Sequence, residues 1–404
     1  MLIASTASAQ TPGFSDASRV AKLSSAFGDI DRMFTAYAER EHIPGGVWGI
    51  VIDGKLAHVG VTGYRDVPAK SPVDSGTVFR IASMTKSFTA VAIMKLRDEG
   101  KLSLDDPADK WVPELKGLKY PTSDSPRLTI RHLMSHTSGV AGWDQPVTVD
   151  DIFDPVASVE RLAAQAPWWE PGSASGYHGI NQGHLIGEVV RRITGKSLGT
   201  FFADEIAGPL GADFHIGLDP KHDARVATVV PPPPMEFDLA SMDQTSPGYR
   251  FFVGPVIDPS VCNTPEWRRA EIGAAGGQGN ARSVARIQSV VSHGGEVDGV
   301  QLLTPATIEL IFEEQSNGVD LCLGIPLRFG VGYALVDTEH FPYLPDSKIC
   351  FWGGWGGSMV INDLERRMTF AYMMNKMEAG IIGGVRSEAL IRSVYDVLGV
   401  VLRA

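Results

Sequence analysis

The sequence predicts an α/β protein in which a sheet domain is interrupted by a mostly helical insert. Two apolar runs near the N-terminus, residues 47–52 and 55–61, flank Asp53-Gly54, which is a strong signal for a two-residue β-hairpin. Strand-like runs return only after residue 330, and the segment between them has the patterns of helices and loops. Strands from both ends of the chain are therefore expected to share one sheet.

The order of these elements predicts the domain boundaries. We expect a mobile N-terminus over residues 1–19, followed by a sheet domain made of residues 20–85 and 286–404. The segment between its two parts, residues 86–285, is expected to form the mostly helical insert. The chain shows no internal repeat.

Helices are predicted where apolar residues recur at helical spacing. The first covers residues 20–41, and the second begins at Ser83 and ends before Gly100, a residue type that suits the position just past a helix C-terminus. Further helices are expected over residues 129–135, 156–165, 181–194, 281–294 and 387–402. Late strands are expected over residues 330–336, 358–362 and 367–374.

Composition limits the class of partner. The chain has 404 residues, 44% of them hydrophobic, which is enough for a sizeable core. Its formal net charge of -11, without a long cluster of Lys or Arg, argues against nucleic acid or an anionic membrane as a partner. No apolar run approaches the length of a membrane span. A small molecule is the expected ligand, and the sequence does not indicate an oligomeric state.

The three cysteines and the N-terminus limit cofactors and localisation. Cys262, Cys322 and Cys350 fit neither a disulfide framework nor a Cys-x-x-Cys metal site, so we expect buried thiols and no metal or other cofactor. Residues 1–9 end in an Ala-x-Ala pattern but lack a basic segment and a long apolar stretch. The protein is expected to be cytoplasmic, or exported if these residues are the end of a signal peptide.

Residues 77–94 contain the strongest chemical signal in the chain. The run of residues 88–94 has Thr89 as its only polar member, which predicts a buried helix. Ser83 and Lys86 stand at its start, on one helix face, where the helix N-terminus favours developing negative charge. This arrangement is typical of an activated serine, although a capping serine and a lysine that extends into water have the same spacing.

A reactive serine also needs a base, an oxyanion site and shelter from water. Lys86 can act as the base if burial lowers its pKa. Tyr177 and His136, both near glycine-rich turns, are candidates for a second proton-transfer group, and a plain buried aromatic residue is the alternative for Tyr177. Backbone N–H groups of the glycine-rich residues 352–358 can form half of an oxyanion hole, unless this segment is only a hairpin packed on its own tryptophans.

Four segments together resemble the serine β-lactamase fold, and within it the class C β-lactamase-like carboxylesterases, called family VIII esterases. The resemblance covers roughly residues 20–400 in the family's order and spacing. It implies a β-lactamase/penicillin-binding-protein-like architecture, with an antiparallel sheet flanked by helices and a mostly helical insert. The four segments are Phe79-Arg80-Ile81-Ala82 with Ser83-Met84-Thr85-Lys86, Leu133-Met134-Ser135-His136-Thr137-Ser138-Gly139, Pro171-Gly172-Ser173 six residues ahead of Tyr177, and Trp352-Gly353-Gly354 at a late strand.

The resemblance also implies the roles of individual residues. Ser83 corresponds to the nucleophile, Lys86 to its general base partner, and Tyr177 to a residue that relays or accepts the proton. The N–H groups of Ser83 and Trp355 correspond to the oxyanion hole. Substrate contacts are expected from Trp352, Gly353, Gly354 and His178.

Two departures from the family pattern set the expected substrate. The family's Tyr-x-Asn is here Tyr177-His178-Gly179, so the substrate-binding Asn amide is absent, and Asn181 cannot be assumed to replace it. The Lys-Thr-Gly triplet of true β-lactamases is here Trp352-Gly353-Gly354, which removes the cation that pairs with a substrate carboxylate. Both losses favour neutral esters over penicillins or D-Ala-D-Ala peptides.

The expected activity is therefore that of a serine carboxylesterase, which cleaves carboxylic esters, possible lactones included, through an acyl-enzyme on Ser83. The alternatives are a β-lactamase or D-Ala-D-Ala peptidase-like enzyme, an acyltransferase, and a non-catalytic ligand-binding member of the fold. Two rival serine sites are weaker. The Gly-x-Ser-x-Gly pattern at residues 195–199 follows a predicted helix rather than the strand that a nucleophile elbow requires, and no Asp is placed to complete a triad with His136.

Overall fold

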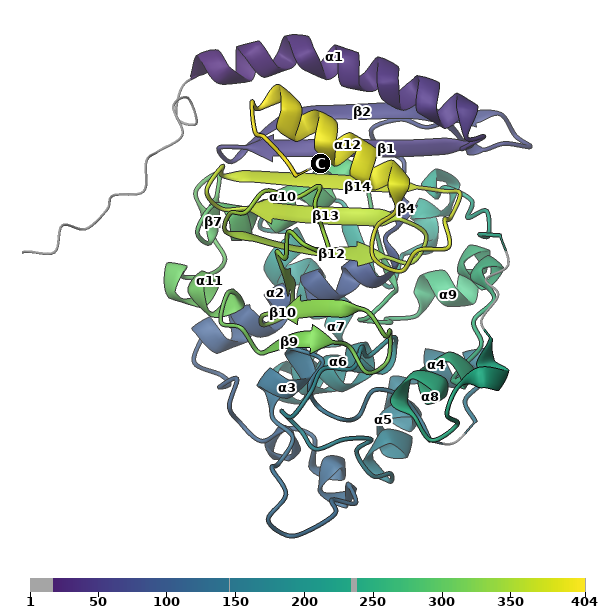
Figure 1. The fold of residues 1–404 in the computed structure, drawn as a ribbon, viewed down its shortest axis with the longest axis vertical. Helices are drawn as coiled ribbons and strands as arrows, with labels where there is room; N and C mark the ends of the chain where they lie inside the picture. The colour runs from purple at the N-terminus through teal and green to yellow at the C-terminus, as the bar shows by residue number, and fades with distance from the viewer. Residues whose placement is uncertain (1–16, 145, 234–237, 404) are drawn as a thin grey trace, which may run out of the picture.

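The computed structural model describes residues 17–144, 146–233 and 238–403. The expected signal-peptide end, and the expected mobile N-terminus up to residue 16, lie outside these ranges. Within them, an antiparallel nine-stranded sheet has the order β3-β2-β1-β14-β13-β12-β11-β10-β9 (Figure 1). Its strands are β1 (Gly45–Ile52), β2 (Lys55–Asp66), β3 (Ser71–Pro72), β9 (Ser316–Val319), β10 (Pro326–Phe329), β11 (Ala334–Leu335), β12 (Ile349–Gly354), β13 (Ser358–Asp363) and β14 (Met368–Met374).

Helices occupy both faces of this sheet and most of the chain between its two halves. The α-helices are α1 (Ala17–Arg40), α2 (Thr85–Asp98), α3 (Ile130–Met134), α4 (Val149–Phe153), α5 (Pro155–Ala163), α6 (Asn181–Thr194), α7 (Leu198–Phe202), α8 (Pro247–Val253), α9 (Pro265–Arg269), α10 (Ala281–Ser292), α11 (Pro305–Ile311) and α12 (Val385–Val397). The 3-10 helices are Ala82–Met84, Ala108–Lys110, Pro113–Gly117, Pro220–Arg225, Leu239–Ser241 and Pro259–Asn263, and Ala203–Ala207 is a π-helix.

The central strands of the sheet, β1, β14, β13 and β12, are buried on both faces, as β1 illustrates. All eight residues of β1 are buried, and successive side chains enter different cores. Trp48 and Ile50 pack in the core that α1 and α12 cover, whereas Val47 and Val51 pack in the core that contains α10. Because strand side chains alternate between faces, an apolar run without polar alternation fits a central strand of this kind. The expected hairpin forms, with Asp53 and Gly54 at φ 50° and 75°, as a type I′ turn requires.

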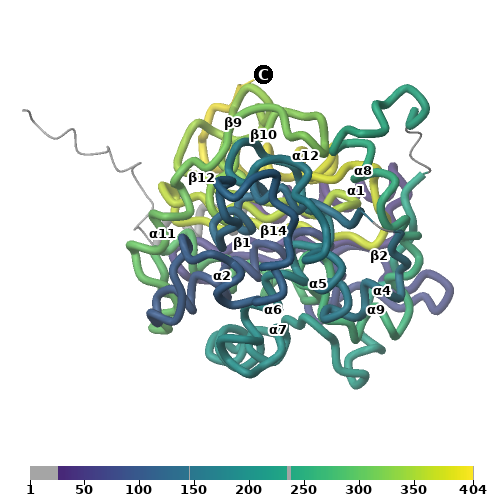
Figure 2. The backbone as a smooth tube through the Cα atoms, turned by 90° about the horizontal axis from the view of Figure 1, so that it is seen from below, coloured from purple at the N-terminus to yellow at the C-terminus, as the bar shows by residue number. Residues whose placement is uncertain are grey.

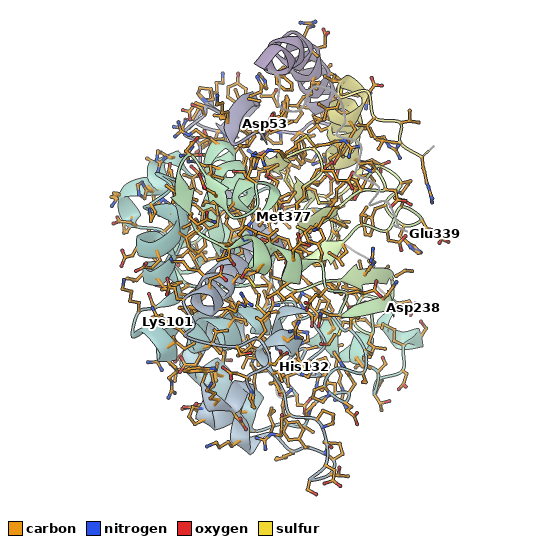
Figure 3. The ribbon with its side chains drawn as sticks, turned by 90° about the vertical axis from the view of Figure 1, so that its left-hand side faces the viewer. Asp53, Lys101, His132, Asp238, Glu339 and Met377 are labelled. Carbon is orange, nitrogen blue, oxygen red and sulfur yellow. The ribbon has the colours of Figure 1, made fainter. Side chains whose placement is uncertain are left out.

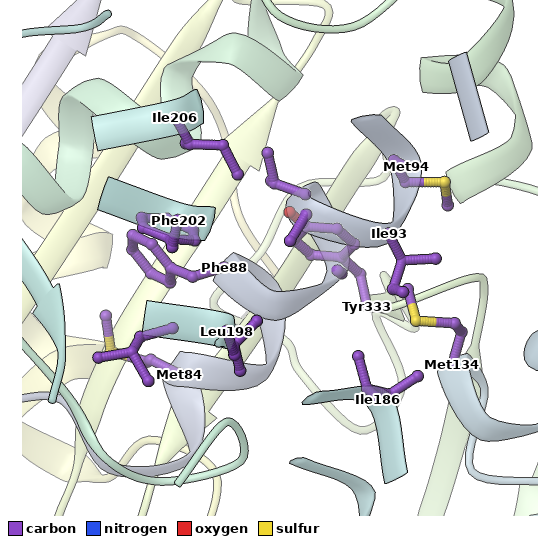
Figure 4. Close-up of a cluster of buried hydrophobic side chains, with 14 of the residues drawn as sticks. Met84, Phe88, Ile93, Met94, Met134, Ile186, Leu198, Phe202, Ile206 and Tyr333 are labelled. Atoms are coloured by element: carbon purple, nitrogen blue, oxygen red, sulfur yellow. The ribbon is translucent and has the colours of Figure 1, made fainter. Parts of the chain in front are cut away.

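The helix α2 lies in the interior, between the sheet and the helices of the middle segment. Seen from below, α2 and α6 lie side by side, and the two helices contact each other (Figure 2). Figure 4 shows the apolar cluster that surrounds α2, in which Phe88 meets Leu198 and Phe202 of α7. The Phe88 ring stacks on Phe214 at a centroid distance of 4.2 Å. This packing holds the start of α2 in place.

Most predicted elements are present, with three differences among the strands. The expected strand at residues 330–336 is reduced to β11, because Gly332 has a φ of 83° and turns the chain before it. No range was predicted for β3, β9, β10 or β12, although the family resemblance placed residues 352–354 of β12 at a late strand. The middle segment is not free of strands either, since β5 (Phe214–Ile216) and β6 (Gly277–Gly279) lie in it and form a small sheet with β4 (Phe79–Arg80). In the later part of the chain, β7 (Glu296–Val297) pairs with β8 (Val300–Gln301).

Candidate active site

Ser83 lies in the turn that joins β4 to α2. Ile81 donates its N–H to the Gly277 carbonyl at 3.0 Å, which ties this turn to β6. Ala82 has a φ of 48°, in the left-handed region that non-glycine residues rarely adopt. Ser83 follows in a 3-10 turn, and the α-helix begins two residues later at Thr85, slightly beyond the predicted start. The turn presents the Ser83 hydroxyl at the N-terminal end of a buried helix.

Lys86 is buried beside Ser83, in the geometry that the three-residue spacing predicts. Its Nζ lies 3.4 Å from Ser83 Oγ and donates to the carbonyls of Gly179 at 2.7 Å and Ala274 at 3.0 Å. No carboxylate within the described ranges pairs with it. Burial lowers the pKa of Lys86 well below its ordinary value of 10.5, because the ammonium form loses its water. The lysine is therefore suited to accept a proton rather than to hold a positive charge.

Tyr177 precedes α6 and faces both of these residues. The Lys86 Nζ lies 4.7 Å from the centre of its ring, and the rings of Trp352 and His136 pack at 5.4 and 4.9 Å. Its hydroxyl has no hydrogen-bond partner among the described residues. Burial raises the pKa of Tyr177 above its ordinary value of 10, and the neighbouring side chains of Ser83 and Trp352 oppose this effect. The group is a neutral phenol at physiological pH.

The segment after β12 brings a backbone N–H to the same place. A Cβ at Gly354 would lie 2.5 Å from the Ile81 carbonyl oxygen and 3.0 Å from the Ala82 Cβ, so only glycine lets β12 approach the serine turn this closely. Ser358 donates its hydroxyl to the same Ile81 carbonyl at 3.2 Å. The N–H of Trp355 has no acceptor within the described part of the chain. Gly354 thus allows the backbone of β12 to contact the backbone of the serine turn. The unpaired N–H of Trp355 follows directly after this contact.

The turn that follows is held from the interior side of the molecule. Gly356 has a φ of 107°, and a Cβ there would lie 2.8 Å from Cγ of Met377. Met377 is itself buried and lies in the interior in Figure 3, whereas Lys101, Asp238 and Glu339 are exposed. The turn that carries Trp355 is therefore packed against a buried side chain.

Ser83 and Tyr177 open into a cavity of about 430 Å³ whose other walls are mostly apolar. Part of the wall comes from α8 and from the proline segment at residues 231–233. The lining residues include Trp143, Ile180, Phe251, Phe252, Val256, Ile257, Trp355 and Ile381. An apolar cavity beside a buried serine suits an uncharged, mostly apolar substrate.

The chain matches the sequence profile of the family described as Beta-lactamase over residues 30–383. It belongs to the beta-lactamase family. The Mycobacterium tuberculosis protein named Esterase/beta-lactamase LipL is 27% identical to it over 366 residues, which cover 88% of this chain and 82% of LipL.

Solved structures agree with this membership of the beta-lactamase family. A structure described as a family VIII carboxylesterase is 30% identical, with a TM-score of 0.82, and the match covers 91% of this chain and 97% of that one. A penicillin-binding protein homologue from Caulobacter crescentus is 31% identical, with a TM-score of 0.81 and coverages of 94% and 97%. The resemblance stated from the motifs and the predicted fold class are confirmed.

The beta-lactamase family pattern at residues 177–179 is altered, as the sequence indicated, and His178 is not where we expected it. Its ring is fully buried, bonds Ser138 Oγ and lies 2.6 Å from the Gly176 carbonyl oxygen, and it does not line the cavity. The structure does not bring this side chain to the cavity, because both of its ring nitrogens are used inside the protein. Asn181 does line the cavity, but its amide nitrogen donates to the Val140 carbonyl.

The other three expected substrate contacts are not among the residues that line the cavity, whereas Trp355, which was expected in the oxyanion hole, lines it directly. Trp352 is buried behind Tyr177, and a Cβ at Gly353 would lie 2.5 Å from the backbone of Gly383, so neither residue is among the lining residues. Gly354 packs against the serine turn and not against the cavity. Apart from Trp355, this segment shapes the site from behind.

Sequence reasoning missed Asp320, which holds Tyr177 in place. Its Oδ1 accepts the N–H groups of Tyr177 at 2.9 Å, Cys322 at 3.0 Å and Leu323 at 2.9 Å. Burial raises the pKa of Asp320, and these three N–H groups oppose the shift. Nothing in the sequence marks this residue, because it lies in a loop between two short strands, 143 positions from Tyr177.

The rival sites are not assembled. Ser197 caps α7 by accepting the Thr200 N–H at 3.2 Å, as a turn between helices predicts. The His136 Nδ1 accepts the His178 N–H at 3.1 Å, and burial lowers the pKa of His136 well below 6.5. No carboxylate in the described part of the chain contacts its ring.

Two other expectations concern cysteines and binding classes. All three cysteines are buried and free, as expected. Among the described residues, no group of three or more His, Cys, Asp or Glu side chains is arranged to hold a metal ion. In the same part of the chain, no helix combines the length and the apolar character needed to cross a bilayer.

Proposed function

We propose that this protein is a serine carboxylesterase that cleaves small-molecule esters through an acyl-enzyme on Ser83. Two relatives support the activity: LipL is named an esterase as well as a beta-lactamase, and a structure 30% identical to this chain is a family VIII carboxylesterase. The observation that carries the proposal is the contact between Ser83 and Lys86, 3.4 Å apart, with Ser83 in the wall of an apolar cavity.

Lys86 is the base in this scheme. In its neutral form it has two N–H donors and one lone pair. The donors are used by the carbonyls of Gly179 and Ala274, which leaves the lone pair for the Ser83 hydroxyl. Burial keeps the neutral form populated by lowering the pKa of Lys86. Ser83 Oγ attacks the ester carbonyl carbon while its proton passes to Lys86.

Tyr177 acts mainly as a proton donor. Burial raises the pKa of Tyr177, so its hydroxyl carries a proton at neutral pH and does not begin the reaction as a phenolate. It donates this proton to the leaving alkoxide and regains one from Lys86, and water then attacks the acyl-enzyme by the reverse path. The N–H groups of Ser83 and Trp355 stabilise the oxyanion in both steps.

The cavity supports neutral ester substrates. Ser83, Tyr177 and Trp355 are surrounded by apolar and aromatic side chains, and Arg250 is the single charged residue among the described lining residues. Arg250 is half-exposed and its guanidinium lies 3.5 Å from Asp144, which balances its charge. A substrate carboxylate therefore has no buried cation to pair with beside Ser83.

Labelling of Ser83 tests the proposal. The native protein is incubated with a fluorophosphonate and with p-nitrophenyl butanoate, and adducts are located by peptide mass spectrometry. We expect an adduct on Ser83, and loss of both labelling and turnover in Ser83→Ala. The matched control is Ser103→Ala, at an exposed serine outside the cavity, which should keep native activity.

Other outcomes would overturn the proposal in distinct ways. Hydrolysis of a chromogenic cephalosporin faster than of the butanoate would establish a β-lactamase. Faster acyl transfer to an added alcohol than to water would establish an acyltransferase. Absence of any adduct and of any turnover in the folded native protein would establish a ligand-binding member of the family.

A further inference from the structure

Phe251 of α8 covers the position where the family's substrate-binding Asn would stand. A Cβ built on Gly179 would lie 2.9 Å from Cε2 and 3.3 Å from Cζ of Phe251. The φ of Gly179 is not in the left-handed region, so its backbone does not require glycine. What glycine provides here is space, and the Phe251 ring fills that space.

The two partners in this contact cannot easily separate. Gly179 is fixed because its carbonyl accepts an N–H from Lys86 Nζ at 2.7 Å. The helix α8 is fixed because Ser246 caps it, and because Gly248 packs against the backbone carbonyls of Leu321 and Cys322. A side chain at residue 179 would have to displace the Phe251 ring or break the contact with Lys86.

This contact places an aromatic ring directly beside the catalytic group. The Phe251 and Tyr177 rings are 6.0 Å apart between centroids, and Phe251, Gly179 and Ser83 line the same cavity. The side chain of Asn181, which could replace the missing amide, is fully buried: its nitrogen donates to the Val140 carbonyl, and its oxygen has no partner among the described residues and no exposed surface. An acyl chain that leaves Ser83 in this direction therefore meets the Phe251 ring and no exposed amide.

We propose that Phe251, seated on Gly179, is a specificity-determining residue that selects esters with apolar acyl groups and rejects acyl groups that bear a carboxamide. The inference rests on the proposed function. An apolar acyl group gains contact with the ring, whereas a carboxamide in that position loses water without finding the donor that an Asn would supply.

A pair of esters of equal shape tests this selection. Phenyl 4-methylpentanoate and phenyl N-acetylglycinate have acyl groups with the same number of non-hydrogen atoms and the same branch point, and differ in the amide. We expect the native enzyme to prefer the first by about tenfold to a hundredfold in kcat/KM, the usual cost of one unpaired amide. In Phe251→Ala the preference should fall to about threefold or less, through a loss on the apolar ester.

Further variants keep the test decisive. Val253→Ala, on the same helix and outside the cavity lining, should keep the native preference. If Phe251→Ala does not fold, Phe251→Leu serves in its place and should keep most of the preference for the apolar ester. The double variant Gly179→Asn with Phe251→Ala should favour the N-acetylglycinate, because the new amide occupies the vacated space.

Failure of this inference differs from failure of the proposed function. Equal rates on the two esters in the native enzyme, with an acyl group still found on Ser83, would overturn the selection by Phe251 and leave the esterase intact. An unchanged preference in Phe251→Ala would do the same. Absence of turnover of both esters, together with no label on Ser83, would overturn the esterase itself.

Discussion

The Lys86 Nζ lies 4.7 Å from the centre of the Tyr177 ring, and both side chains are buried. The ring face attracts a cation, so it opposes the desolvation that lowers the pKa of Lys86. The hydroxyl of the same tyrosine carries the proton-transfer chemistry. The ring of Tyr177 therefore affects the pKa of Lys86, and the hydroxyl of Tyr177 affects kcat.

Tyr177→Phe separates these two effects. The variant keeps the ring and removes the hydroxyl, so kcat should fall by about a hundredfold to ten-thousandfold, the usual contribution of a general acid or base. The pH at which kcat/KM is half-maximal should stay where it is, because Lys86 keeps the ring beside it. A pH profile of residual activity measures both, and a shifted midpoint with full kcat would contradict the assignment.

The pH dependence of kcat/KM should report Lys86. Below its pKa the lysine is an ammonium ion and cannot accept the Ser83 proton, so activity should rise as the pH rises through that pKa. Because burial lowers the pKa of Lys86, this rise should occur well below pH 10.5, the ordinary value for lysine. Lys86→Ala should lose most of kcat and the rise with it. Lys95→Ala, on the same helix, should keep the native profile.

Asp320 should control the position of Tyr177. Asp320→Ala removes the acceptor of three buried N–H groups and should lower the free energy of unfolding by about 1–3 kcal/mol, with a parallel loss of kcat. Asp320→Asn keeps an acceptor oxygen of the same shape, and should recover most of the stability and activity. Urea unfolding and kcat are measured on both variants. Equal damage from Ala and Asn would show that the charge, and not the hydrogen bonding, is required.

Gly354→Ala should damage catalysis more than folding. Its methyl group would meet the Ile81 carbonyl oxygen and push the turn that carries Trp355 away from Ser83. Loss of one oxyanion donor commonly costs about a hundredfold to a thousandfold in kcat. Gly187→Ala in α6 is the control, since a Cβ there meets Leu198 only at 3.8 Å. Native kcat in a folded Gly354→Ala protein would rule out this role for the turn.

His178 should make the protein sensitive to acid. Burial lowers its pKa from 6.5 to about 3, so the folded protein leaves it neutral where the unfolded chain binds a proton. The free energy of unfolding should therefore fall as the pH falls from about 6.5 toward 3, by up to roughly 1.4 kcal/mol per pH unit from this residue. His178→Gln should reduce that slope, and His42→Asn, at an exposed position, should not. Urea titrations at several pH values provide the measurement.

The sequence by itself determined the parts of this protein that depend on neighbouring residues. The spacing of Ser83 and Lys86 places both on one helix face, and the structure has them 3.4 Å apart. The Asp53-Gly54 hairpin and the helix over residues 181–194 were also predictable, because a turn type and a helical period each depend on one continuous segment of the sequence. Motif order was enough to identify the fold.

Only the tertiary structure decided what surrounds the serine. Whether Tyr177 faces Lys86, and whether the Trp355 N–H is free, depends on how segments far apart in the chain pack against one another. His178 shows the limit of motif reasoning, because its neighbours in the sequence suggested a substrate contact and its neighbours in space use both ring nitrogens. Phe251 is the opposite case, a residue in the wall of the site that no motif indicated. No pattern connects it to Gly179, 72 positions earlier by number, and the contact arises because α8 packs over the cavity.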